Sequence, residues 1–412
     1  MESSAHPLSD LHQLYHERPL SMDTFIHSIE TAVPEYRFSQ AYARDRLKEQ
    51  FAERRARKII HHVYDASGIE TRHSVVDDWG SKSPDALFRT GAAGRWLEPG
   101  TEERNKVFAQ ASRRMSVDLV RRLLQGCSHF AASDVTHLIT VSCTGFYNPG
   151  PDFYIVQQLE LDPSVERYHL GFMGCYAVLP ALRMARQFCE ADPDAVVLVV
   201  SVELCSLHLQ MDAEDVESLV AGSLFSDGAA AALVSARPPT PGHAAFRLQH
   251  FGSTLLPDGE HDMAWTLGNR GFRMSLSSYV PDLLGANIQP VVGALLQSQG
   301  SAICDVDNWA IHPGGKSILD KASDALQLGP DQLAVSRDVL RRYGNMSSAT
   351  VLFVLERFMR QMRDDGGDQA TLALAFGPGL TVESSLMILV RAPIPAPAPG
   401  HATDLALRLT PP

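Results

Sequence analysis

The stretch H-L-I-T-V-S-C, residues 137–143, begins the region that decides the fold. It is a short apolar run rich in β-branched residues, as expected of a strand that is buried on both faces of a sheet. A-V-V-L-V-V-S-V-E, residues 195–203, is a second run of the same kind. Between the two runs, Cys175 follows Gly174 and introduces an apolar segment with helical spacing. The region therefore predicts a buried strand, a helix and a second buried strand.

The same order recurs in the second half of the chain. N-W-A-I-H-P-G (308–314) and T-L-A-L-A-F-G-P-G (371–379) are strand-like, and Asn345 introduces an apolar helical segment between them. The strand-to-strand offsets are 58 residues, from 137 to 195, and 63 residues, from 308 to 371. The strand-to-helix offsets are 38 and 37 residues. We interpret this as an internal duplication of one α/β unit, with the two halves meeting near residues 236–245.

Outside these units, two further stretches predict helices. Residues 39–62 read as one charged amphipathic helix, and residues 107–126 read as another.

The composition restricts the classes of function. Apolar residues make up 45% of the chain and charged residues 20%, which is ordinary for a folded protein. The longest strongly apolar run, Ala195–Val202, is much shorter than the roughly 20 residues that span a bilayer. Six cysteines without a C-x-x-C pair predict a reduced, cytoplasmic protein that has no zinc site. The net charge of −12 argues against nucleic acid as a partner.

Cys175 is the first candidate catalytic residue. At the start of a helix a thiol faces the positive end of the helix dipole, which predicts a lowered pKa and a nucleophilic thiolate. Pro180 is tolerated only within the first turn, so the regular helix is expected to start after Cys175. The alternative is a buried structural cysteine.

His312 and Asn345 are the other two candidates. His312 ends a strand, and the Pro-Gly-Gly that follows it would hold the imidazole at a sheet edge. The following G-G-K-S is not a phosphate-binding loop, because Ala310 stands where that motif needs glycine. Asn345 could be a helix N-cap, or its amide could donate hydrogen bonds to an oxyanion. The order Cys, His, Asn is also that of papain-like proteases, but their local cysteine signature is missing.

Several ordered motifs carry a resemblance to a known family. The motifs resemble those of type III polyketide synthases, of the chalcone/stilbene synthase-like superfamily, over residues 22–391. Within that superfamily the chain looks like the bacterial alkylpyrone and alkylresorcinol synthases. The motifs are S-G-I-E-T-R-H (67–73), G-F-M-G-C-Y-A (171–177), L-F-S-D-G-A-A-A (224–231), W-A-I-H-P-G-G (309–315), Y-G-N-M-S-S-A (343–349) and F-G-P-G-L-T-V-E (376–383).

The resemblance implies an α/β thiolase-like fold, in which two duplicated αβαβα halves form a five-layer sandwich. Residues 22–240 would be the half with the nucleophile, and residues 241–391 the half with His312 and Asn345. Residues 1–21 are expected to be a disordered N-terminal segment, and residues 392–412 a proline-rich tail. A homodimer is implied as well.

The resemblance also assigns roles to residues. Cys175 would carry the acyl group, and His312 with Asn345 would bind the thioester carbonyl. Substrate-binding positions would be Phe225 and Met274, as gatekeepers, together with Cys143, Cys205 and His208, which differ from the plant pattern. A basic group would clamp the phosphates of CoA, although a solvated helix face is an equal alternative. The group consists of Lys48, Arg54, Arg55, Arg57 and Lys58.

The implied activity is an iterative decarboxylative Claisen condensation of malonyl-CoA onto an acyl-CoA starter. The small or flexible pocket residues favour a fatty acyl starter and a pyrone- or resorcinol-type product. No cofactor other than the CoA thioester substrates and no metal is expected. Three alternatives remain, namely a single-round 3-oxoacyl synthase of the same fold, a non-catalytic thiolase-fold subunit, and a cysteine hydrolase.

Overall fold

The computed structural model describes residues 22–77, 79–91, 94–127, 129–211, 215–256, 259–363 and 366–393. The predicted disordered segment 1–21 and residues 394–412 of the predicted tail lie outside the described residues.

One large mixed sheet forms the frame of the molecule. Its nine strands lie in the order β11 (Asn308–Ile311), β12 (Gln369–Gly377), β13 (Thr381–Arg391), β8 (Ala244–Leu255), β1 (Thr24–Ala32), β7 (Asp227–Ser235), β6 (Val196–Leu204), β4 (His137–Ser142) and β5 (Glu166–Gly171). The four strands predicted from their apolar runs are β4, β6, β11 and β12. β6 and β7 are buried along their whole length, as expected of strands covered on both faces.

The topology of the sheet repeats once. In the first unit β4 runs parallel to β6, β6 antiparallel to β7, and β7 antiparallel to β1. In the second unit β11 runs parallel to β12, β12 antiparallel to β13, and β13 antiparallel to β8. Within the large sheet the two units join through β1 and β8, which pair at three positions beginning with Thr24 and Leu248. The predicted duplication is therefore confirmed, and the two half-sheets share one hydrogen-bonded seam.

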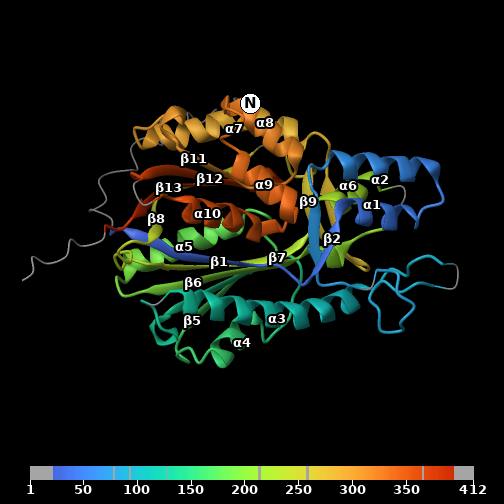
Figure 1. The fold of residues 1–412 in the computed structure, drawn as a ribbon, viewed down its shortest axis with the longest axis horizontal. Coiled ribbons are helices and arrows are strands. Elements are labelled where there is room, and N and C mark those ends of the chain that lie inside the picture. Colours follow the sequence, from blue (N-terminus) through green and yellow to red (C-terminus); the bar gives the residue numbers. More distant parts are fainter. Residues whose placement is uncertain are drawn as a thin grey trace, which may run out of the picture.

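Helices fill the spaces around the sheet in layers. α5 (Val178–Ala191) and α10 (Thr350–Gln361) lie between the two half-sheets (Figure 1). α3 (Thr101–Gly126) and α4 (Pro151–Gln158) cover the outside of the first half-sheet, and α7 (Val280–Ser298) and α8 (Lys316–Leu326) cover the outside of the second (Figure 1).

These layers confirm the five-layer αβαβα arrangement. The first seven residues of α10 are all buried, because a helix between two sheets has no solvent face.

Smaller elements complete the end of the molecule that carries the site. α9 (Ala334–Tyr343) precedes α10, and α6 (Val216–Leu224) packs against α2 (Arg54–Ala66). Two hairpins stand outside the large sheet. They are β2 (Tyr36–Ser39) with β3 (Thr71–Ser74), and β9 (Met263–Gly268) with β10 (Gly271–Leu276). No helix in the described part of the chain has both the length and the apolarity needed to cross a membrane.

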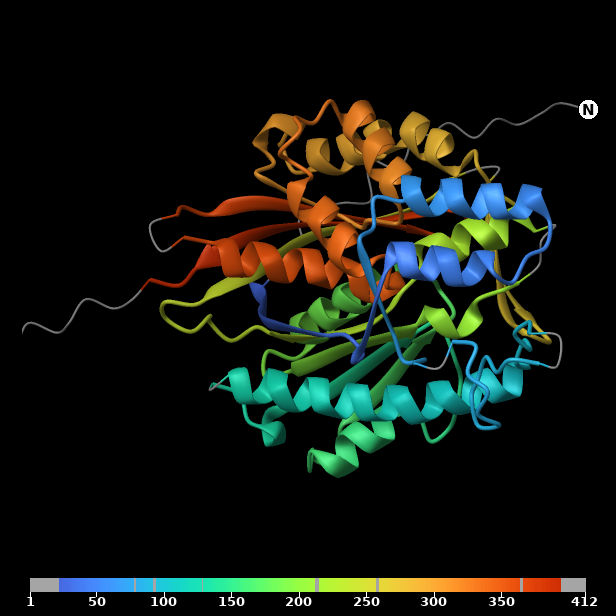
Figure 2. The same cartoon turned by 45° about the vertical axis from the view of Figure 1, so that its right-hand side comes forward.

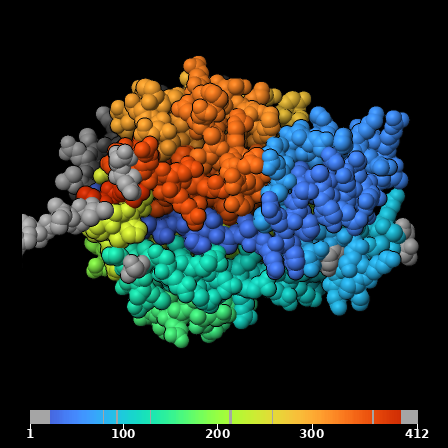
Figure 3. All heavy atoms as spheres, viewed as in Figure 1, coloured from blue at the N-terminus to red at the C-terminus, as the bar shows by residue number. Residues whose placement is uncertain are grey.

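The predicted single helix over 39–62 is wrong. The segment folds into α1 (Gln40–Lys48) and α2, which lie side by side at one end of the molecule (Figures 2 and 3). Ser39 caps α1 by accepting a hydrogen bond from the Tyr42 N–H. Phe51, between the helices, is buried in a cluster with Leu47 and Ile60. The chain must turn between α1 and α2 to bury Phe51, Leu47 and Ile60 together. The many charged residues around Phe51 made the segment read as one continuous helix.

Candidate active site

Cys175 lies on a tight turn between β5 and α5. Gly174 has a positive φ of 89°, and a Cβ on it would lie 2.4 Å from Cδ of Pro378, so only glycine fits there. α5 begins at Val178, three residues after Cys175, as the position of Pro180 predicted. The thiol is buried, with 8% of the residue exposed.

His312 follows the last residue of β11. Its backbone N–H donates to the Leu374 carbonyl of β12 over 2.7 Å, which continues the pairing of the two strands by one residue. The imidazole is buried, and neither ring nitrogen has a hydrogen-bond partner among the residues that the structure describes. A buried polar group without a partner is uncommon, so both ring nitrogens are available to a ligand.

Asn345 occupies a matching turn in the second unit. Gly344 before it has a φ of 72°, and the Asn345 N–H donates to the Leu224 carbonyl over 2.9 Å. The side-chain oxygen accepts from the Ser347 N–H over 2.9 Å, and Nδ2 donates to the Gly314 carbonyl over 3.1 Å. The amide therefore makes one bond of the kind a helix cap makes, and its second N–H lies within reach of the Cys175 sulfur.

One cavity brings the three side chains together. Cys175, His312 and Asn345 all line a space of about 760 Å³, which also borders the start of α7 and the start of α8. Cys175 comes from the first unit of the duplication, and His312 and Asn345 come from the second. The cavity therefore lies between the two units.

Burial controls the protonation of this group. Burial raises the pKa of Cys175 to about 12, although hydrogen bonds from Ser347 and Asn345 oppose the rise. Burial also lowers the pKa of His312 to about 3. The prediction of a lowered Cys175 pKa is therefore wrong for the free protein, because desolvation outweighs the dipole of a helix that begins three residues later. Both shifts favour the uncharged forms, a Cys175 thiol and a neutral His312 imidazole.

Phe225 and Met274 stand where three cavities meet. Both residues line the large cavity, a small space of about 20 Å³ beside Cys175, and an aromatic pocket of about 90 Å³. Phe225 follows α6, and its backbone pairs with that of Asn345 in an isolated bridge. Both side chains are half-buried, which suits residues at a junction between cavities.

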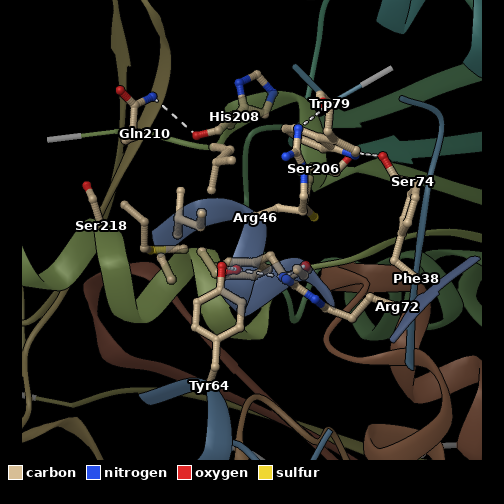
Figure 4. Close-up of a pocket in the computed structure, with 18 of the residues that line it drawn as sticks. Phe38, Arg46, Tyr64, Arg72, Ser74, Trp79, Ser206, His208, Gln210 and Ser218 are labelled. Atoms are coloured by element: carbon tan, nitrogen blue, oxygen red, sulfur yellow. Dashed lines mark hydrogen bonds between the residues drawn. The ribbon is translucent and has the colours of Figure 1, made fainter. Parts of the chain in front are cut away.

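The structure places the three other predicted pocket residues on the walls of the smaller spaces. Cys143 and Cys205 both line the space beside Cys175. His208 lines the aromatic pocket, where Figure 4 shows it among Phe38, Tyr64 and Trp79.

His208 is held in one orientation within this wall. Its Nδ1 accepts from the Phe272 N–H over 3.1 Å, so Nε2 donates to the Thr144 carbonyl over 2.8 Å. Burial lowers the His208 pKa to about 3, which keeps the ring neutral.

A buried carboxylate beside the site escaped the sequence analysis. Glu203 of β6 is fully buried and accepts hydrogen bonds from the Cys143 N–H over 3.0 Å and the Thr144 hydroxyl over 2.9 Å. The Ser348 hydroxyl donates to its other oxygen. Burial raises the pKa of Glu203 despite these bonds. A single acid at the end of an otherwise apolar strand was the sequence signal that could have identified it.

The predicted CoA clamp lies outside the cavity. Arg54, Arg55, Arg57 and Lys58 are exposed on α2, and no ion pair joins them to any other described residue. Lys48 is held by Asp45 at 3.7 Å. From α2, the side chains that line the large cavity are His62 and Val63. Binding of the CoA phosphates by this basic group stays a prediction. The polar side chain of α2 that borders the cavity is His62.

Comparisons with known proteins cover nearly the whole described chain. The family described as "Chalcone and stilbene synthases, N-terminal domain" matches residues 22–238, and the corresponding C-terminal domain matches residues 247–391. The alpha-pyrone synthesis polyketide synthase-like Pks18 of Mycobacterium tuberculosis is 35% identical over 371 residues, which cover 89% of this chain and 91% of the relative.

Solved structures match over the same length. PKS-I from the brown alga Ectocarpus siliculosus matches with a TM-score of 0.83 at 27% identity, covering 91% of this chain and 100% of that chain. The 1,3,6,8-tetrahydroxynaphthalene synthase of Streptomyces coelicolor matches with a TM-score of 0.79 at 29% identity, covering 90% of this chain and 100% of that chain.

Proposed function

Because the chain belongs to the chalcone and stilbene synthase family and is a type III polyketide synthase, we propose that Cys175 carries a fatty acyl starter onto which malonyl-CoA units are condensed in turn. The observation that carries this proposal is the shared cavity lined by Cys175, His312 and Asn345. A nucleophile and two hydrogen-bonding side chains in one buried space are what acyl transfer with enolate stabilisation requires.

Loading of the starter begins from the Cys175 thiol and the neutral His312 imidazole. A neutral imidazole has one N–H and one lone pair, so His312 can accept the proton of Cys175 as the sulfur attacks the thioester carbonyl of acyl-CoA. The new Cys175 thioester bond forms as the bond from carbon to CoA sulfur breaks. His312 then returns the proton to the CoA thiolate and becomes neutral again.

Extension uses the two hydrogen-bond donors. When the carboxylate of malonyl-CoA leaves as CO2, the remaining enolate carries negative charge on its oxygen. An N–H of His312 and the second N–H of Asn345 can donate to that oxygen in a buried site, where such bonds are strong. The enolate carbon attacks the Cys175 thioester and the bond from the acyl carbon to the Cys175 sulfur breaks, which leaves the extended chain on CoA and Cys175 as a thiolate. For another round this thiolate attacks the thioester of the extended chain, and CoA leaves as a thiolate that takes a proton from solvent. Each step uses only side chains and CoA thioesters, and we propose no other cofactor.

The starter and the product are the finer part of the proposal. Cys143, Cys205 and Met274 are small or flexible, which favours an aliphatic chain over a rigid aromatic starter. The relative Pks18 is described as acting in alpha-pyrone synthesis. We therefore propose that this chain makes pyrone- or resorcinol-type products from fatty acyl-CoA.

A product assay tests the proposal. The pure protein is incubated with acyl-CoAs of graded chain length and malonyl-CoA, and the products are identified by mass. Triketide or tetraketide products are expected. Products limited to one added C2 unit would indicate a single-round 3-oxoacyl synthase. If Cys175 were not acylated, the chain would be a non-catalytic subunit.

We also propose that the protein forms a homodimer. β5 is one of the two edge strands of the large sheet, and its outer edge has no strand partner among the described residues. Unpaired sheet edges commonly add another strand, and a second copy of the chain could supply it. Light scattering on the purified protein measures the mass directly, and a monomer at micromolar concentration would contradict the proposal.

A further inference from the structure

The start of α2 concentrates positive charge in a chain whose net charge is −12. Six consecutive residues, 53–58, hold four cations and one acid, and these are Glu53, Arg54, Arg55, Arg57 and Lys58. All four cations are exposed, and no ion pair joins them to any other described residue. A local excess of positive charge on an acidic protein is typical of a surface that binds a negatively charged partner.

These cations occupy an unfavourable position in the helix. The N-terminal end of a helix carries a partial positive charge, which favours acidic side chains and disfavours basic ones. α2 has no acid in its first turn, and the side chain of Glu53 makes no capping hydrogen bond. A sequence that breaks a local rule without a compensating contact in the protein indicates a functional surface. A negatively charged partner would supply the missing compensation.

The cations share a face of α2 that is turned away from the core. Ala56 and Ile60, one turn apart, are buried and define the inner face of the helix. Arg55, Lys58 and His62 follow one another at intervals of three and four residues, so they lie together on the outer side. α2 itself lies at the outer surface of one end of the molecule (Figures 1 and 3).

This face leads to the mouth of the large cavity. His62 is exposed and also lines that cavity, so the basic face reaches the point where the cavity opens to solvent. Val216 and Tyr279 line the same cavity, and they are 40% and 68% exposed. Glu217 of the lining accepts a hydrogen bond from the Leu276 N–H over 3.2 Å. The mouth therefore combines a basic helix with apolar and aromatic side chains that face water.

This combination fits a membrane surface better than a small anion. At 100° per residue the four cations cover roughly 160° of the circumference of α2, which is too wide for one phosphate group. Cations beside exposed apolar side chains are typical of segments that lie on anionic bilayers, and tyrosine is enriched at the boundary between headgroups and acyl chains. An acidic protein would satisfy the cations but would leave the exposure of Tyr279 and Val216 unexplained.

We propose that the outer face of α2, together with Val216 and Tyr279, docks the protein on an anionic lipid bilayer, with the mouth of the large cavity turned toward the headgroups. The docking surface stands on the charges and exposures described above. Its use by the enzyme rests on the proposed function. A long fatty acyl-CoA and a product with a long alkyl chain both partition into bilayers through their methylene groups, so substrate would enter and product would leave at the docked surface.

Vesicle binding tests the proposal. The full-length protein is sedimented with vesicles of equal parts phosphatidylcholine and phosphatidylglycerol, and with vesicles of phosphatidylcholine alone, at low and at physiological salt. R55Q/K58Q removes two charges from the proposed face. R113Q/R114Q is the matched control, because it removes two charges from α3, where both arginines are also exposed. Y279W places a fluorescent side chain at the mouth, and its emission is compared with that of the wild type.

The wild type should bind the vesicles that contain phosphatidylglycerol, and salt should weaken this binding through screening. Each Lys or Arg near an anionic surface strengthens binding about fivefold, so R55Q/K58Q should bind about 30-fold more weakly. R113Q/R114Q should bind nearly as tightly as the wild type. The emission of Y279W should shift to the blue when vesicles are added. R55Q/K58Q should remain folded in melting curves, because it removes cations from the positive end of a helix.

Three results would overturn the inference. The first is a wild-type protein that does not sediment with phosphatidylglycerol vesicles at low salt; a raised KM of R55Q/K58Q for hexanoyl-CoA would then identify CoA as the ligand of this face. The second is an equal loss of binding in R55Q/K58Q and R113Q/R114Q, which would assign the effect to net charge. The third is unchanged emission of vesicle-bound Y279W, which would place the contact elsewhere. Failure to acylate Cys175 from fatty acyl-CoA without vesicles would instead overturn the proposed function and leave the docking result standing.

Discussion

Replacing Asn345 with alanine removes one of the two proposed donors to the malonyl enolate. The loss of a single oxyanion donor typically slows the chemical step by about 10²- to 10³-fold, or about 2.7–4 kcal/mol. We expect this decrease in the rate of CO2 release from malonyl-CoA. Starter loading on Cys175 should continue, because His312 still accepts the proton of the thiol.

The structure also sets the cost in stability. Asn345 makes two side-chain hydrogen bonds, to the Ser347 N–H and to the Gly314 carbonyl. Each is worth about 0.5–1.5 kcal/mol, so N345A should lose about 1–3 kcal/mol of unfolding free energy. N345D is the matched control, since its carboxylate keeps the acceptor for Ser347 while removing both donors. A fall in decarboxylation in both variants, measured on protein shown to be folded, assigns the effect to the donors.

The assay follows radiolabelled CO2 release and radiolabelled acyl transfer in parallel. C175A should form no polyketide but should still decarboxylate malonyl-CoA, because the enolate donors remain. H312A should lose both activities, because it lacks an enolate donor and the base for Cys175. If N345A decarboxylated normally, Asn345 would be only a helix cap, and the proposed site would be wrong.

Four further outcomes are expected. Burial holds the Cys175 pKa near 12 and the His312 pKa near 3. The rate of Cys175 alkylation by iodoacetamide should therefore rise about tenfold per pH unit between about pH 6 and pH 9, because the thiolate is the reactive form. A rate that already reaches its plateau below about pH 7 would reveal a preformed thiolate–imidazolium pair. E203A leaves the buried Cys143 N–H without its acceptor and takes one acceptor from the Thr144 and Ser348 hydroxyls, so it should lose at least about 1–3 kcal/mol of stability in denaturant melts, with E203Q losing less. An unchanged midpoint for E203A would contradict this role. C205F should shorten the starter chains that are accepted, and an unchanged profile would remove Cys205 from the acyl path. Deleting residues 393–412 should leave the melting temperature and turnover nearly unchanged, because a proline-rich tail adds little to a core; a large drop in either would refute this.

The predictable parts of this molecule are those set by local sequence. The runs at β4, β6, β11 and β12 are apolar because both faces of these strands are covered, and no knowledge of distant residues is needed to recognise them. Cys175 and Asn345 were recognisable because each follows a glycine that forms a turn.

Other features depend on residues that are far apart in the chain. Trp265 borders the space beside Cys175 only because the β9–β10 hairpin folds back over the loop after β4. The pKa of Cys175 depends on burial by both half-sheets, whereas the sequence shows only the nearby helix dipole. The turn between α1 and α2 likewise depends on packing against α6.

The division of the site between the two units has a mechanical consequence. The thiol stands on one unit and the enolate donors stand on the other. The contacts that join the units include three β1–β8 residue pairs, the bridge between Phe225 and Asn345, and the packing of α5 against α10. A displacement of one unit by an ångström would separate nucleophile from donors without unfolding either, and such misplacements can cost about 10²-fold in rate. Cut within residues 236–243, the chain would yield two fragments that are each chemically incomplete. The turnover rate of the two fragments mixed together would then measure how tightly they associate.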